Sequence, residues 1–252
     1  MFLFNVPATW QSAAAHRLYA EELRRLGRAL CDLGAVPPAN AALAETMALY
    51  EAARQRLLAG RPSLGSRQFF EELLRYHRDG ALESSPSGGP ALPLNRRGIA
   101  LAIVGAPLHP DWAALFDAIE LAGGRIELDA TALGERALPP PFDRRRLREE
   151  PFETLCDAYF GKIPDAFRRP NSQLYRWLRD RLAERGVRGI LFHEYTWCDT
   201  WRAEFARMKE WASAPIHRLE NQGQPRPDPR LLFRLEAFLE MLAASALRRP
   251  SL

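Results

Sequence analysis

The sequence GIALAIVG at residues 98–105 decides the fold, because it has no polar side chain that would face solvent. A short apolar run of this kind, bounded by turn residues, predicts a strand buried on both faces, here Gly98 to Val104. Ala106-Pro107-Leu108 follows as a turn, and the apolar spacing after it predicts a helix from Pro110 to Ala122. Gly123-Gly124 then ends that helix.

The same order of strand, turn and helix recurs along the rest of the chain. Further strands are predicted at 125–128, at 189–195 (GILFHEY) and at 215–219. Further helices are predicted at 152–160, 172–185, 200–211 and 229–247. Strands separated by helices need crossover connections, which favour a parallel sheet. We therefore predict an α/β fold in which residues 98–252 form an open, mainly parallel Rossmann-like sheet of about four strands with helices on both faces.

Upstream of the first strand the pattern is helical. Apolar residues recur at helical spacing over 12–33, 40–58 and 66–78, so residues 1–80 are predicted to form a helical amino-terminal region. The stretch DGALESSPSGGPALP at 79–93 is rich in Gly, Ser and Pro and poor in large apolar residues. We expect residues 81–97 to be a flexible linker.

Composition limits the function classes. The chain is 47% hydrophobic and 26% charged, and its longest apolar stretch is too short to span a bilayer. No signal peptide is recognised, and three widely spaced cysteines suit a reducing compartment, so a cytoplasmic location is expected. The net charge of +4 comes from arginines spread along helices, which does not favour nucleic-acid binding. The same distribution of arginines is equally compatible with a basic patch that faces an anionic cofactor.

Ligands of open α/β sheets bind at the carboxyl ends of the strands, which directs attention to four loops, 105–109, 129–136, 196–199 and 220–228. The sequence contains no GxGxxG after the first strand, no GxxxxGK[ST] and no GxSxG. His109 lies in the first of these loops and is a candidate cofactor contact. Gly223 and Gln224 precede the last helix, whose amino terminus favours an anion or a thioester oxygen, although a rigid loop without a ligand explains them equally well.

Two polar residues, His193 and Glu194, interrupt the third strand. A polar side chain in a buried strand requires a partner, so each is either hydrogen-bonded for structural reasons or available for proton transfer as a catalytic residue. His16 and His77 lie on predicted helices and are interpreted as surface residues. Cys198 follows the third strand and is either a small buried side chain or a metal ligand or reactive thiol.

Three segments, taken in order, resemble one family. Residues 112–130, with the sequence WAALFDAIELAGGRIELDA, resemble a helix and a strand of that family that end in the pattern G-G-R-hydrophobic-V-x-D. GVRGILFHEYTWCDTWRAEFARMKEWASAPIHRLE at 186–220 resembles a strand that ends in a C-D pair and leads to a hydrophobic-P strand. NQGQPRPDPRLLFRLEAFLEML at 221–242 is similar to an ending with Gly-Gln and then Arg-hydrophobic-Glu-Ala-Phe. The family is that of the 2-hydroxyacyl-CoA dehydratases and benzoyl-CoA reductases, of which this chain resembles a shortened member.

The resemblance implies an iron-sulfur lyase or reductase that acts on acyl-CoA thioesters by one-electron chemistry. Cluster-bearing subunits of that family hold a [4Fe-4S] cluster with three cysteines, because thiolates stabilise both oxidation states of iron. Cys198-Asp199 matches the last ligand position. Asp165, after Pro164, stands where the family has its middle cysteine, and is either a carboxylate ligand or a solvated loop residue. The amino-terminal cysteine domain is expected to be missing, so the cluster is expected to be incomplete or absent in this chain alone.

Two hypotheses follow from this resemblance. In the first, the chain is a subunit that forms a heterodimer with a homologous cluster-bearing subunit and is served by an ATP-dependent activator protein. In the second, it is a non-catalytic paralogue that binds and stabilises a cluster-bearing partner. Retention of Cys198-Asp199 and of Gly223-Gln224 favours the first hypothesis, and loss of the other ligands favours the second.

Overall fold

The apolar run at 98–105 forms the strand β1 (Ile99–Gly105), which lies inside a four-stranded parallel sheet of order β2-β1-β3-β4. The computed structural model describes residues 1–80 and 97–247. The other strands are β2 (Gly124–Ala130), β3 (Gly189–Tyr195) and β4 (Ile216–Asn221). All three pairings are parallel, which confirms the α/β prediction. The order reverses between β1 and β3, so the topological switch lies at the carboxyl ends of these two strands.

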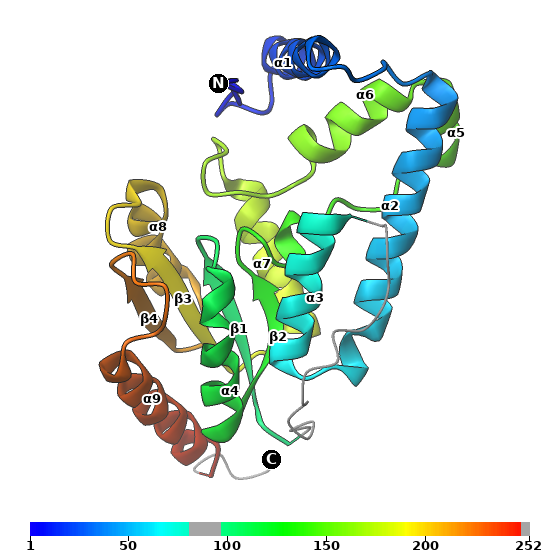
Figure 1. The fold of residues 1–252 in the computed structure, drawn as a ribbon. Coiled ribbons are helices and arrows are strands. Elements are labelled where there is room, and N and C mark those ends of the chain that lie inside the picture. The colour runs from blue at the N-terminus through cyan, green and yellow to red at the C-terminus, as the bar shows by residue number, and fades with distance from the viewer. Residues whose placement is uncertain (81–96, 248–252) are drawn as a thin grey trace. The chain divides into compact units, whose positions relative to one another are not determined.

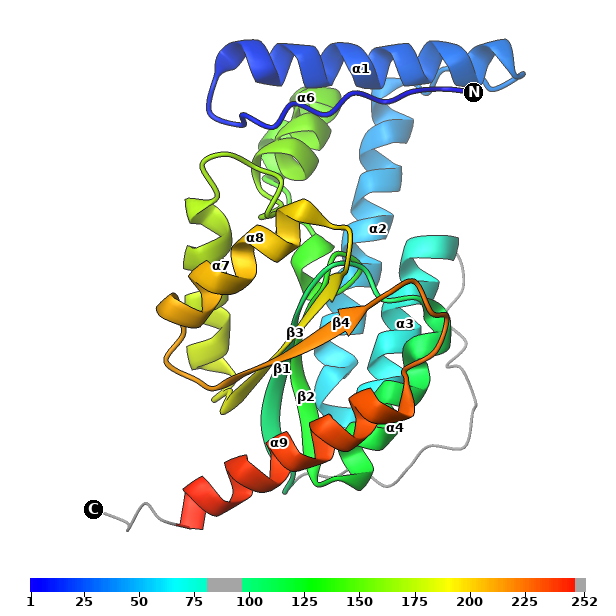
Figure 2. The same ribbon diagram turned by 90° about the vertical axis from the view of Figure 1, so that its left-hand side faces the viewer.

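Helices cover both faces of this sheet (Figures 1 and 2). On one face, Leu101 and Leu191 pack in a core with α3 (Ser66–Asp79), α4 (Ala113–Leu121) and α9 (Pro229–Leu247). On the other face, the ring of Phe192 contacts Trp201 and Phe205 of α8 (Asp199–Trp211). Because neighbouring residues of a strand point to opposite faces, His193 lies on the α4 and α9 side and Glu194 on the α8 side.

The chain divides into two compact units that are interleaved in sequence. The first unit is formed by residues 1–56 and 138–175, and the second by residues 57–137 and 176–252. The first unit contains α1 (Ala13–Asp32), most of α2 (Asn40–Gly60), α5 (Arg144–Glu149), α6 (Pro151–Cys156) and a π-helical turn (Asp157–Gly161). The second contains the sheet and most of α7 (Ser172–Glu184).

Helix α3 belongs to the second unit, together with the sheet, although it precedes the predicted linker. Phe70 of α3 is buried and stacks on Phe116 of α4 at 4.6 Å between ring centroids. The hydroxyl of Ser66 accepts a hydrogen bond from the backbone N–H of Ile126 in β2 at 3.0 Å. Apolar burial and this hydrogen bond therefore group α3 with the strands. The linker predicted at 81–97 lies, apart from Arg97, outside the described residues.

Most predicted elements are present, with a few differences in extent. Strand β2 is longer than the predicted 125–128 because its pairing with β1 continues to Ala130. The single helix predicted at 152–160 is instead α6 followed by the π-helical turn. The helix predicted from Pro110 to Ala122 is a 3-10 helix at Pro110–Trp112 followed by α4. The 3-10 helices at Arg61–Ser63 and Glu135–Ala137, and the helix α5, had no clear periodic signal.

Gly105 lets β1 approach β3 at the topological switch. Its φ is +141°, and a Cβ atom built there would lie 1.9 Å from the backbone oxygen of His193. The backbone N–H of Ala106 donates to that same oxygen at 3.0 Å. A side chain at position 105 would therefore displace the segment that leads from β1 into the site.

We predict that Gly105→Ala lowers the free energy of unfolding by about 3 kcal/mol or more, because a backbone clash adds to an unfavourable φ. Urea denaturation followed by circular dichroism measures this change. Gly186→Ala is the control, since Gly186 has φ +57° but open space around its Cβ position. The control should lose only about 1 kcal/mol. Equal losses in the two variants would contradict the close approach at Gly105.

Candidate functional site

The segments that follow the first and last strands meet above β3. Trp112, just before α4, is buried, and its indole Nε1 donates a hydrogen bond to the backbone oxygen of Gln224 at 3.1 Å. The same indole packs edge-on against the ring of His193, with 5.1 Å between centroids. The carboxyl edge of the sheet therefore holds a bridge between the β1 and β4 loops, as the rule for open α/β sheets predicts.

A pocket of about 250 Å³ lies beside this bridge, at the end of β4 and the start of α9. Its lining combines one indole with arginine, carboxylate and amide side chains, contributed by Trp112, Arg218, Glu220, Gln222, Gln224, Asp228, Arg230, Leu231 and Arg234. All of these residues belong to the second unit. The pocket is polar and rich in cations, which suits an anionic ligand.

The three pocket arginines differ in their partners. Arg218 Nε donates to Glu194 Oε1 at 2.7 Å, and its guanidinium stacks on the ring of Phe205. Arg230 and Arg234 have no ion-pair partner among residues 1–80 and 97–247. Asp228, which precedes helix α9, accepts a hydrogen bond from the backbone N–H of Arg230 through Oδ1 at 2.7 Å, so its carboxylate offsets the positive end of the helix dipole and the two guanidiniums supply the positive charge here. This part of the pocket can bind an anion without first losing an ion pair.

His193 is fully buried on β3 below Trp112. Its Nδ1 lies 3.2 Å from the backbone oxygen of Ala106, which can only accept, so Nδ1 carries the proton. Burial lowers the pKa of His193 to about 4, so the ring is neutral near pH 7 and Nε2 is an acceptor. Within the described ranges Nε2 has no hydrogen-bond partner. The predicted catalytic role of His193 stays a prediction, whereas its contact with Trp112 is observed.

Glu194 is fully buried on the opposite face of β3. It accepts hydrogen bonds from both Nε and one terminal nitrogen of Arg218 through Oε1. Removing one partner of a buried ion pair leaves an uncompensated charge, so each side chain holds the other in place. Glu194 therefore fixes the arginine that lines the pocket. Its predicted catalytic role stays a prediction.

The three predicted cofactor contacts have different positions. Gln224 lines the pocket, and its side-chain oxygen accepts from the backbone N–H of Gln222 at 3.0 Å. Gly223 has φ +96° in the turn after β4, and its N–H donates to the side chain of Asn221 at 2.8 Å. His109 is exposed, accepts from the backbone N–H of Asp111 through Nδ1 at 3.2 Å, and is not among the lining residues.

Trp112 and Arg230 were not singled out in the sequence, and Arg234 was noted there only as the arginine of the family-like ending, although these three residues contribute most of the pocket's character. A signal for the arginines was present, because two arginines fall in the first two turns of a helix without acidic residues in its first turn. No comparable local signal existed for Trp112. Its role depends on a hydrogen bond to a residue 112 positions away in the sequence.

The predicted metal ligands do not form a metal site in the described part of the chain. Cys198 is half-buried at the amino-terminal cap of α8, where its N–H donates to the backbone oxygen of Tyr195 at 2.9 Å. Asp165 belongs to the first unit, and its Oδ1 accepts from the backbone N–H of Phe167 at 2.8 Å. Burial raises the pKa of the Cys156 thiol to about 11, which disfavours the thiolate.

Over residues 1–80 and 97–247, no group of three His, Cys, Asp or Glu side chains is arranged to hold a metal ion. A [4Fe-4S] cluster with one open iron needs three ligands. The residues described here therefore do not fit a cluster held by this chain alone.

We predict that His193→Asn removes a pH dependence of stability, because asparagine can keep a donor near the Ala106 oxygen but does not titrate. The pKa of His193 rises from about 4 in the folded protein to its ordinary 6.5 on unfolding. Its contribution to stability is therefore complete above the higher value and is lost as the pH falls towards the lower one, by about 3 kcal/mol at most. Urea denaturation of both proteins across this pH range measures the difference. Parallel profiles would show that His193 does not titrate in this way.

The comparison with protein families identifies the family of the chain. The family model of the 2-hydroxyglutaryl-CoA dehydratase D-component matches residues 1–242. No curated protein matches the chain. No helix in the described residues is long and apolar enough to cross a membrane. Because the family model covers nearly the whole sequence, the chain belongs to the 2-hydroxyglutaryl-CoA dehydratase D-component family.

Proposed function

We propose that the chain is an acyl-CoA-binding component of a 2-hydroxyacyl-CoA dehydratase-type enzyme and that a homologous partner subunit holds the [4Fe-4S] cluster. The family is described as one component of the dehydratase, which implies a partner subunit. The proposed assembly is a heterodimer in which this chain contributes the pocket at the carboxyl edge of its sheet.

The observation that carries the proposal is the pair of guanidiniums, Arg230 and Arg234, that line the pocket without an ion-pair partner in the described part of the chain. CoA carries a diphosphate and a ribose phosphate, and arginine binds phosphate oxygens through paired N–H donors. These groups would bind phosphates, while Gln224 and the turn at Gly223 offer polar contacts to the thioester end.

His193 and Glu194 are proposed as positioning residues in this function. His193 supports the indole of Trp112, which in turn bonds to the Gln224 segment. Glu194 holds Arg218. Neither of them is among the residues that line the pocket, so each acts through a side chain that does.

The second candidate is the non-catalytic paralogue, which binds and stabilises a cluster-bearing partner without binding an acyl-CoA. The observation in its favour is the incomplete ligand set, in which Cys198 is the one cysteine that matches the family pattern. The two candidates differ in one measurable property, because only the first requires an affinity of this chain for CoA thioesters.

We predict that the isolated chain binds acetyl-CoA and that Arg234→Met weakens this affinity by about tenfold, because a charge-assisted contact to phosphate is lost. Isothermal titration calorimetry measures both affinities. Arg179→Met is the matched control, since Arg179 is an exposed arginine on α7 that pairs with Asp180. Rising salt should weaken the wild type more than the Arg234 variant. Absence of acetyl-CoA binding would favour the non-catalytic paralogue.

We also predict that the chain purified alone without oxygen, and incubated with iron and sulfide, retains no stoichiometric cluster. Iron and sulfide analysis with visible absorbance spectra measures this, and Cys198→Ser should give the same result as the wild type. A coloured protein whose iron is lost in the Cys198 variant would show that this chain holds a cluster itself. The proposal that the cluster belongs to the partner would then fail.

A further inference from the structure

Trp197, in the loop between β3 and α8, is the exposed member of the six tryptophans, with an exposed fraction of 88%. The other five also lie in the described ranges and are buried or half-buried. Covering an indole removes about 200 Å² of surface from water, which is worth about 5 kcal/mol. Folding of the chain leaves this contribution unused at position 197, so the indole is available to a ligand.

The turn that carries Trp197 has a fixed backbone. The N–H of Thr196 donates to the backbone oxygen of Asn221, at the end of β4, at 2.9 Å. The N–H of Cys198 donates to the backbone oxygen of Tyr195, also at 2.9 Å. Because the residues on both sides of Trp197 are hydrogen-bonded, the exposure of its indole is a property of an ordered turn.

This turn lies at the rim of the sheet-edge pocket. The hydroxyl of Thr196 donates to Glu220 Oε1 at 3.2 Å, and Glu220 lines that pocket. Asn221, which holds the backbone of Thr196, is flanked in the sequence by the two lining residues Glu220 and Gln222. All of these residues belong to the second unit. Trp197 therefore directly follows a residue that contacts the wall of the pocket.

The charges of the pocket leave a role for an uncharged contact. Arg230 and Arg234 have no ion-pair partner in the described part of the chain, but the carboxylates of Glu220 and Asp228 line the same pocket. A phosphate group would meet charges of both signs here, which limits the affinity that it gains from charge alone. A flat base stacked on an indole adds about 1–3 kcal/mol that does not depend on charge.

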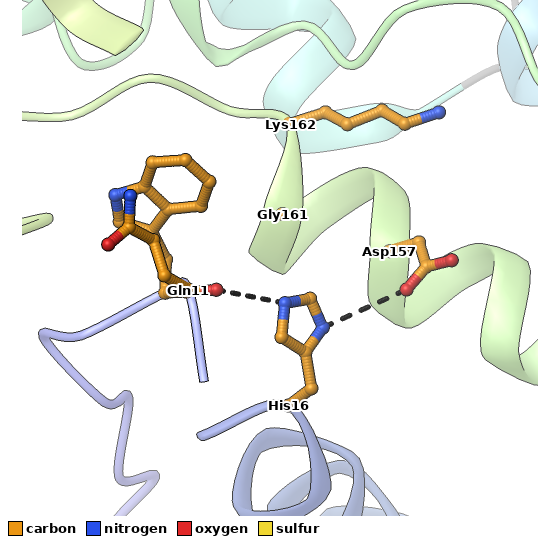
Figure 3. A pocket seen from close by; sticks show the side chains of 6 residues that line it. Gln11, His16, Asp157, Gly161 and Lys162 are labelled. Atoms are coloured by element: carbon orange, nitrogen blue, oxygen red, sulfur yellow. Dashed lines mark hydrogen bonds and ion pairs between the residues drawn. The ribbon is translucent and has the colours of Figure 1, made fainter. Parts of the chain in front are cut away.

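A pocket of about 400 Å³ in the first unit also contains a tryptophan, but its groups are paired within the protein (Figure 3). His16, interpreted as a surface residue from the sequence, is half-buried there, with Nε2 2.9 Å from the backbone oxygen of Trp10 and Nδ1 3.8 Å from Asp157 Oδ1. The indole of Trp10 donates to the backbone oxygen of Pro170 at 2.7 Å, and Asp157 pairs with Arg146 at 2.7 Å. We assign no ligand to this pocket.

We propose that Trp197 binds the purine base of the nucleotide whose phosphates contact Arg230 and Arg234. This inference rests on the acyl-CoA binding proposed above and extends it, because CoA carries an adenine next to its phosphates. The phosphates would lie inside the pocket, and the adenine would stack on the indole at its rim. The loops after β3 and β4 would thus hold the nucleotide end of the ligand together.

The test uses the whole chain and isothermal titration calorimetry with three probes. Acetyl-CoA and adenosine 3′,5′-bisphosphate carry the base, whereas acetyl-phosphopantetheine lacks it. Trp197→Leu should weaken the binding of the first two about tenfold and leave the third unchanged. Trp197→Phe should retain most of the affinity, because phenylalanine still offers a ring for stacking. Phe167→Leu is the matched control, since Phe167 is an exposed aromatic residue of the first unit, and it should bind all three probes as the wild type does.

Two results with the variants would overturn the inference while leaving acyl-CoA binding intact. They are an unchanged affinity of Trp197→Leu for acetyl-CoA, and an equal loss of affinity for all three probes. Because Trp197 is exposed, its variants should keep the thermal midpoint of the wild type.

The wild type separates this inference from the proposed function. If it does not bind acetyl-CoA, the proposed function fails. Adenosine 3′,5′-bisphosphate that still binds, and binds more weakly to Trp197→Leu, would then support the base site by itself. If neither base-bearing probe binds the wild type, the base site fails as well.

Discussion

The organisation of the second unit depends on how β3 accommodates two consecutive polar side chains inside a sheet buried on both faces. Burying a polar group without a partner is unfavourable by several kcal/mol, so each side chain must be matched by the layer that covers it. His193 meets this requirement in part, through the hydrogen bond of its Nδ1 to the Ala106 backbone, and its ring packs against the indole of Trp112. Glu194 meets it in part, through the pairing of its Oε1 with Arg218, while His193 Nε2 and Glu194 Oε2 have no hydrogen-bond partner in the described part of the chain. One strand thus fixes a pocket-lining side chain on each of its faces.

Because of this arrangement, the buried contacts that stabilise the sheet also set the geometry of the pocket. Trp112 and Arg218 line the pocket, yet their positions are set by residues that do not reach it. Fully satisfied polar contacts inside a protein make a core rigid and specify one arrangement, whereas partly satisfied ones weaken it. A substitution at β3 would therefore alter ligand binding through the geometry of its neighbours, without removing any group that touches the ligand.

The sequence predicted the strands and long helices well because their apolar periodicity is local. The run at 98–105 and the GILFHEY strand were recognisable in isolation, and of the four loops that the rule for parallel sheets indicated, the loop at 220–228 lines the pocket. The pairing of Glu194 with Arg218 and the bridge from Trp112 to Gln224 were not predictable, because each joins distant residues through the tertiary fold. The π-helical turn was also missed, since helical periodicity does not distinguish it from an α-helix. Apolar periodicity predicted the fold and three motifs indicated the family, but the ligand set has to be examined residue by residue.

The interleaving of the two units has a consequence for how the protein is made. The first unit is complete only after residues 138–175 have been synthesised, and strands β1 and β2 are synthesised before that segment. The sheet that contains β1 and β2 can form completely only after β3 and β4 have been synthesised, and these strands lie beyond residue 175. Domains commonly fold one after another during synthesis, from the amino terminus onward. Here both units would reach completion only late in translation, so nascent chains would expose apolar strands for longer and depend more on chaperones than a sequential two-domain protein of equal length.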